Sequence, residues 1–106
     1  MDIPEETKIR NQLLEVLNGE YNSFWIYDYH LTINGIKEIF KLINTQPSIT
    51  KLWLNDDFLT NDSIKELSKQ LYHNPYIREF ILYRNQISTE GVQFLSDMLL
   101  HNFTIK

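Results

Sequence analysis

The sequence predicts an α/β solenoid, in which short strands form a parallel sheet on a concave face and helices cover the convex face. From Tyr21 onward, apolar residues coincide without a gap when the chain is laid on itself at a 28-residue offset. Within each copy, apolar residues first alternate, as in a strand, and then follow the three-, four- and seven-residue spacing of a helical face. Each copy is therefore expected to contain one strand and one helix, and stacking of the copies to bury their apolar faces.

A single domain is expected for 106 residues, because a second core would be too small to be stable. Residues 1–20 are predicted to hold an N-terminal capping helix that covers the open end of the stack. Glu5 and Glu6 suit the positive end of the helix dipole, and Gly19 marks the end of the helix. The predicted apolar stripe of this helix is Ile9, Leu13, Val16 and Leu17. The remaining chain is divided into repeats 21–48, 49–76 and 77–104, with a fourth strand barely begun.

Three positions of each strand region are predicted to point into the core. In the order of the repeats they are Tyr21, Ile49 and Ile77; Phe24, Leu52 and Phe80; and Ile26, Leu54 and Leu82, with Ile105 starting a fourth copy. An aliphatic residue and a hydroxyl follow each strand: Leu31 and Thr32, Leu59 and Thr60, Ile87 and Ser88. The hydroxyl is expected to cap the next helix by accepting a first-turn N–H.

The predicted helices bury one face each. That face is formed by Ile36, Ile39 and Ile43; by Ile64, Leu67 and Leu71; and by Val92, Leu95 and Leu99. The copies close with Gln46, Asn74 and Asn102, and Pro47 and Pro75 follow the first two. Proline ends a helix and returns the chain to extended geometry, so the next strand is expected to start at once.

The third copy carries the most complete motif, Ile77-x-x-Phe80-x-Leu82-x-x-Asn85-x-Ile87, followed by Gly91-Val92-x-x-Leu95-x-x-x-Leu99-x-x-Asn102. This pattern resembles the ribonuclease-inhibitor class of leucine-rich repeats, and the resemblance covers residues 21–106. The chain departs from the family at the asparagine that binds loop backbone groups, because Asp57 and Tyr29 replace it in the other two repeats. The resemblance implies capture of a protein on the concave face, often with inhibition or regulation of that protein. A weaker likeness to small effectors of intracellular bacteria implies delivery into a host cell.

Two outward positions of each strand are predicted to face the concave surface. They hold Trp25, Trp53 and Ile81, and, two residues further on, Tyr27, Asn55 and Tyr83. Neighbours in each set are expected about 4.8 Å apart, as in any stacked sheet. Exposed aromatic side chains of this kind typically mark a protein-binding surface. The alternative is a strand register shifted by one residue, which would place both tryptophans in the core.

Charged residues flank these positions and suggest a polar rim around an apolar centre. Lys51 and Glu79 lie on one side, and Asp28, Asp56 and Arg84 on the other. Ordinary solubilising charge is the alternative explanation for all five.

Composition and motifs exclude several classes of function. A net charge of −4 lacks the basic surface that nucleic acid requires. Without cysteine or a long apolar run, the chain is expected to be cytoplasmic and away from membranes. His73 and His101 are expected to interact with the last helix carbonyls in preference to a metal, and His30 has no nucleophile near it. No catalytic residue, metal or cofactor is therefore predicted.

The expected function is capture of another protein, such as an enzyme, on the concave face. A self-associating scaffold is the alternative, with a homo-oligomer formed through the open C-terminal edge of the sheet or through the tryptophan face. An enzyme is the third and weakest interpretation, because no nucleophile, base and orienting group share a surface.

Overall fold

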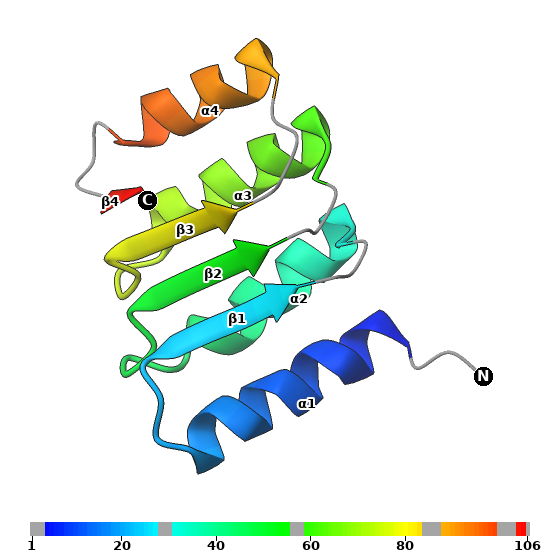
Figure 1. The fold of residues 1–106 in the computed structure, drawn as a ribbon, viewed down its shortest axis with the longest axis vertical. Coiled ribbons are helices and arrows are strands. Elements are labelled where there is room, and N and C mark those ends of the chain that lie inside the picture. The colour runs from blue at the N-terminus through cyan, green and yellow to red at the C-terminus, as the bar shows by residue number, and fades with distance from the viewer. Residues whose placement is uncertain (1–3, 28–30, 56–58, 84–87, 100–103, 106) are drawn as a thin grey trace.

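The computed structural model describes residues 4–27, 31–55, 59–83, 88–99 and 104–105. Along these residues, helices and strands alternate in the order α1 Glu5–Asn18, β1 Ser23–Tyr27, α2 Ile33–Ile43, β2 Lys51–Asn55, α3 Asn61–His73, β3 Glu79–Tyr83, α4 Thr89–Leu99 and β4 Thr104–Ile105. The strands form one parallel sheet in the order β1-β2-β3-β4 (Figure 1). The predicted α/β class, with a parallel sheet, is confirmed.

The first three strands pair in the register that the sequence period predicts. Phe24 lies opposite Leu52, and Leu52 lies opposite Phe80, so each partner lies one full period of the sequence repeat further along the chain. The same offset holds for all five residues of each strand. Equivalent side chains therefore lie side by side across the sheet.

Backbone hydrogen bonds at the strand starts repeat with the same spacing. The N–H groups of Thr50 and Lys51 donate to the Asn22 carbonyl, at 2.9 and 3.2 Å. Twenty-eight residues later, the N–H groups of Arg78 and Glu79 donate to the Thr50 carbonyl, at 2.7 and 3.1 Å. This pattern fixes where each strand starts relative to the strand before it.

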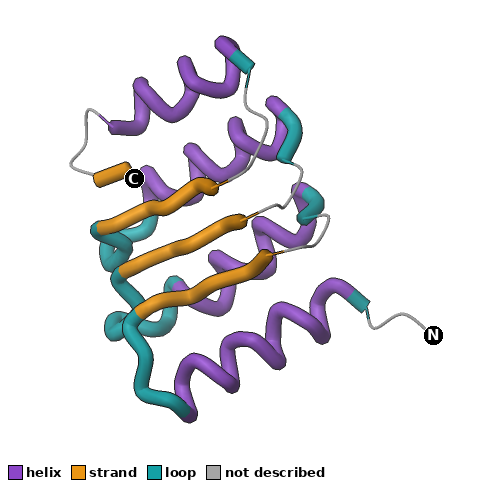
Figure 2. Tube along the Cα trace, viewed as in Figure 1, coloured by secondary structure: helices purple, strands orange, loops and turns teal. Residues whose placement is uncertain are grey.

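The helices that follow the strands cover one face of the sheet (Figures 1 and 2). Helix α3 packs between α2 and α4, and α1 packs against α2 and β1. The core lies between these two layers. From the strands it receives Phe24, Ile26, Leu52, Leu54 and Phe80, and from the helices Ile9, Leu13, Val16, Ile36, Ile39, Ile43, Ile64, Leu67 and Leu71. The side chains of Val92, Leu95 and Leu99 lie outside the described part.

Hydroxyl side chains cap the helices that follow the strands, as the sequence predicts. Each hydroxyl accepts the N–H three residues later, which would otherwise have no partner in the helix. The pairs are Thr32 with Gly35 at 3.0 Å, Thr60 with Ser63 at 3.1 Å, and Ser88 with Gly91 at 3.4 Å.

The first helix is joined to the second through Glu5. Its carboxylate accepts the backbone N–H of Thr32 at 3.0 Å and also the Thr32 hydroxyl. Gly35 leaves room for this carboxylate, because a Cβ at that position would lie 2.5 Å from the Glu5 carboxyl carbon. The acidic first turn of α1 therefore also completes the cap of α2.

Glu5→Ala is expected to lower the free energy of unfolding by about 1 kcal/mol, because both hydrogen bonds from Thr32 are lost. Urea denaturation of the full chain measures this. Glu6→Ala is the matched control, since its exposed carboxylate lies 4.0 Å from Arg10 and an exposed pair contributes about 0.5 kcal/mol or less. Equal losses in the two variants would show that Glu5 does not join the helices.

Tyr21 departs from the predicted pattern. It was expected in the core with Ile49 and Ile77, which are buried, but it is 54% exposed. Its N–H still donates to the carbonyl of Val16 at the end of α1, at 3.0 Å, and Glu20 before it has a left-handed φ of 57°. This turn holds Tyr21 outside the core, so the prediction of an inward side chain was wrong.

The fourth strand also differs from the prediction. Ile105 was expected at the position of Ile77, but Thr104 and Ile105 pair with Glu79 and Phe80. This pairing falls three positions short of the full repeat period, which would place the partners of Glu79 and Phe80 at positions 107 and 108. The edge of β3 that was predicted to be unpaired is therefore covered at its first two residues.

A buried asparagine closes the turn between α3 and β3. Asn74 is 4% exposed, and its Oδ1 accepts the N–H groups of Tyr76 and Ile77, at 2.8 and 2.7 Å. Its Nδ2 donates to Oδ1 of Asn44 at the end of α2. The residue 28 positions before Asn74 is Gln46. There the backbone carbonyl of Gln46 accepts the N–H of Ile49, at 3.0 Å.

Asn74→Ala is expected to lower the free energy of unfolding by about 2 kcal/mol, because the buried N–H of Ile77 and the partly buried N–H of Tyr76 lose their acceptor. Chemical denaturation followed by circular dichroism checks this. Gln46→Ala is the control, and a change below about 0.5 kcal/mol is expected there, because backbone atoms make that turn. A loss in Asn74→Ala no greater than in the control would contradict the assigned role.

Candidate functional site

The face of the sheet opposite the helices carries a row of large apolar side chains. Trp25, Trp53 and Ile81 are register partners on β1, β2 and β3, and we call them the outer column. Trp53 is 43% exposed, and Trp25 and Ile81 are half-buried. Residues on either side of Trp53, Leu52 and Leu54, are fully buried. The predicted alternation is confirmed, and the alternative of a register shifted by one residue is wrong. Trp25 still packs partly against the core.

Tyr21 extends the outer column beyond β1. Its ring meets the Trp25 ring edge to face, with centroids 5.5 Å apart. Aromatic pairs favour this geometry, since the edge of one ring is positive and the face of the other negative. Sequence reasoning missed Tyr21 as a surface residue because the 28-residue period assigns it an inward position. The sequence feature that indicates an outward side chain is the position of Tyr21 in the turn that follows α1.

The predicted second set of outward residues is described only in its backbone. Tyr27, Asn55 and Tyr83 end their strands and are register partners. Their side chains, and Asp28, Asp56 and Arg84 entirely, lie outside the described residues. Their predicted part in binding stays a prediction.

Two of the predicted rim residues pair with each other. Lys51 Nζ lies 3.1 Å from Glu79 Oε2, and the two side chains are 33% and 35% exposed. They are register partners on β2 and β3 and lie two residues before Trp53 and Ile81, hence on the same face of the sheet. The pair contributes about 1 kcal/mol or less, and it places two opposite charges next to the outer column.

Of the three histidines, the structure describes His73. His73 is exposed near the end of α3, with its ring edge to face against Tyr72 at 5.0 Å between centroids. No three His, Asp or Glu side chains converge on a metal-sized site within the described residues. His30, His101 and Asp57 are not among those residues.

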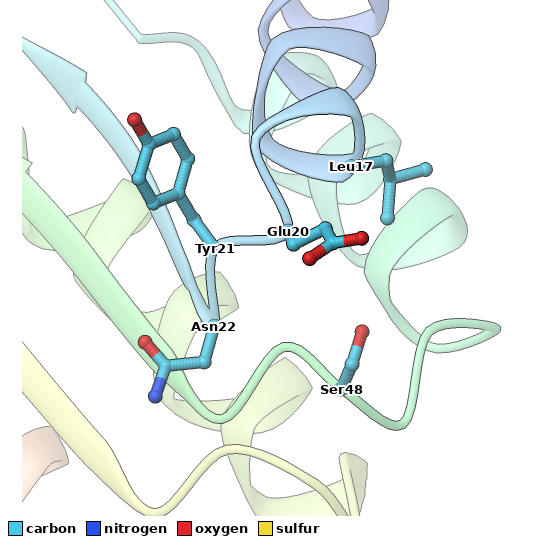
Figure 3. Close-up of a pocket in the computed structure, with 5 residues that line it drawn as sticks. All are labelled: Leu17, Glu20, Tyr21, Asn22 and Ser48. Carbon is cyan, nitrogen blue, oxygen red and sulfur yellow. The ribbon is translucent and has the colours of Figure 1, made fainter.

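Two shallow hollows lie outside the outer column. One, of about 280 Å³, is lined by Leu17, Glu20, Tyr21, Asn22 and Ser48 (Figure 3). The other, of about 350 Å³, lies on the helical side and is lined by Ile33, Asp62, Lys65, Glu66 and Lys69. Sequence reasoning pointed to neither, because both form where separate elements meet.

Comparison of the chain with protein-family models, with curated proteins and with solved structures found no match. No described helix has both the length and the apolar character that are needed to cross a membrane.

Proposed function

We propose that this chain is a protein-interaction module that holds a protein partner on the outer column and thereby regulates or inhibits that partner. The observation that supports this most is Trp53, which is 43% exposed in the central strand β2 with Trp25 and Ile81 beside it. The helices lie on the other face, so the fold itself does not need an indole here. Tryptophan and tyrosine supply a large share of the binding energy at protein interfaces.

The architecture that we propose is a short leucine-rich repeat solenoid of the ribonuclease-inhibitor class. It is supported by the 28-residue register of β1 to β3, by the repeated hydroxyl caps and by the repeated backbone bonds at the strand starts. In such solenoids the sheet lines the concave face. The outer column would then lie where these proteins bind their partners.

The resemblance to ribonuclease-inhibitor-like proteins further suggests that the bound partner is an enzyme whose active site becomes covered. A reducing compartment, the cytoplasm, is the proposed place of action, in keeping with a chain that has no cysteine. The weaker likeness to bacterial effectors adds the cytoplasm of a host cell.

Affinity capture tests the proposed function. The native chain, the Trp25→Ala/Trp53→Ala variant and a Tyr72→Ala control are immobilised and exposed to lysates of the source organism and of a host. Tyr72 is a suitable control because it is aromatic, 52% exposed and on α3, away from the outer column. A protein retained by the native chain and by the control but lost with the double variant supports the proposal. Equal retention by all three contradicts it.

Self-association is the second candidate, and the edge of the sheet favours it. Strand β4 pairs with the first two residues of β3, so within the described part residues 81–83 form an edge with unused backbone groups. Sedimentation velocity distinguishes the candidates, because a self-associating chain sediments faster as its concentration rises and a monomeric module does not.

A further inference from the structure

The hollow at the end of α1 has one carboxylate, that of Glu20, among its lining residues. In Figure 3 the Ser48 hydroxyl points toward the Glu20 carboxylate, with Leu17 on the opposite side. The hollow measures about 280 Å³, which leaves room for a side chain of a partner. It thus combines a carboxylate, a hydroxyl and an aliphatic wall.

Glu20 is held at this place by the turn that ends α1. Its φ of 57° is the only positive value at a non-glycine residue within the described part. Gly19, which would adopt that conformation at lower cost, has a φ of −83° instead. The left-handed residue closes the end of α1 in the usual way, since the N–H groups of Glu20 and Tyr21 donate to the carbonyls of Leu17 and Val16, at 3.1 and 3.0 Å.

The carboxylate of Glu20 is open to an external cation. Other carboxylates, those of Glu6, Glu38 and Glu79, make the ion pairs found among the described residues. The chain as a whole has a net charge of −4. A lysine or arginine side chain fits the hollow, since its aliphatic stem can lie along Leu17 while its N–H groups donate to carboxylate and hydroxyl oxygens.

Tyr21 connects the hollow to the outer column. Tyr21 is one of the residues that line the hollow, and its ring contacts the Trp25 ring edge to face. We propose that the hollow binds a lysine or arginine side chain of the protein partner. In the partner this side chain would lie next to the apolar residues that cover the outer column. This inference rests on the proposed function and adds a chemical requirement to the partner.

The test is an NMR titration of the ¹⁵N-labelled full chain with N-acetyl-arginine amide, with N-acetyl-leucine amide as the uncharged control. Saturable shifts are expected at the backbone N–H groups of residues 20–22 and 48 with the arginine probe alone. Glu20→Gln is expected to weaken that binding at least tenfold, and Ser48→Ala about threefold. Glu15→Gln, which removes an exposed carboxylate of α1 that does not line the hollow, should leave it unchanged. Absence of these shifts, or equal binding by Glu20→Gln, overturns the inference.

Two further ligands identify the source of the cation. A capped Leu-Arg-Leu peptide is expected to bind at least tenfold tighter than N-acetyl-arginine amide and to shift the indole signals of Trp25 and Trp53. If spermidine instead binds the hollow more tightly than the peptide, the site is one for small amines and the inference is wrong. These outcomes do not depend on the affinity capture. If the Trp25→Ala/Trp53→Ala variant no longer retains the partner, the proposed function is upheld even where the arginine probe fails to bind the hollow.

Discussion

Leu54→Asp is expected to abolish cooperative folding of the chain. Leu54 is fully buried in β2, which lies between β1 and β3. An aspartate there places a carboxylate without a partner charge in the core, at a cost of more than about 4 kcal/mol. A domain of this size has a total stability of about 5–15 kcal/mol, so little would remain. Far-UV circular dichroism and urea denaturation measure the loss.

Trp53→Asp is the matched control, because it introduces the same charge one residue earlier on the opposite face of the strand. Trp53 is 43% exposed, so a charge at that position remains hydrated, and a smaller loss in the free energy of unfolding, about 2 kcal/mol, is expected from the lost indole contacts. A Leu54→Asp protein that stays folded, or a Trp53→Asp protein that unfolds, contradicts the register of the sheet.

The Trp25→Ala/Trp53→Ala variant is expected to bind the captured partner at least about 100-fold more weakly than the native chain. Truncation of a central interface tryptophan typically costs about 2 kcal/mol or more, which is about 30-fold in Kd. The two side chains are neighbours across the sheet, so their effects are not expected to add fully. Isothermal titration calorimetry with the purified partner gives the value.

The same variant must remain folded for this result to count. Trp25 is half-buried and packs against the core, so a loss of about 1–2 kcal/mol in the free energy of unfolding is expected, most of it from this residue. Tyr72→Ala should bind the partner with unchanged affinity. An unfolded double variant would show that the tryptophans are structural, and unchanged affinity would show that the partner binds elsewhere.

Most of the fold between β1 and α3 was predictable because its determinants are local and repeated. The 28-residue spacing alone sets Phe24 opposite Leu52 and Phe80. Alternation along the strand then separates the buried Leu52 and Leu54 from the exposed Trp53. The hydroxyl caps follow in the same way, since a hydroxyl three residues before a free N–H is sufficient to satisfy that N–H.

Features that occur once in the chain were not predictable from the period. Tyr21 occupies an inward position by count, but the turn after α1, with its left-handed Glu20, points it outward. Strand β4 is three residues out of register. The hollow beside Glu20 forms where the C-terminal end of α1 meets the turn before β2. The spacing of residues in the sequence does not specify that contact.

Whether a protein partner covers the outer column is tested most directly by NMR. The two indole N–H signals of the ¹⁵N-labelled chain are recorded while the unlabelled captured partner is added. We expect that the signals of Trp25 and Trp53 both shift and that the exchange of their N–H protons with solvent slows. The backbone signals of α3 around Tyr72 should stay in place. A bound partner that leaves both indole signals unchanged and shifts those of α3 instead would contradict this expectation.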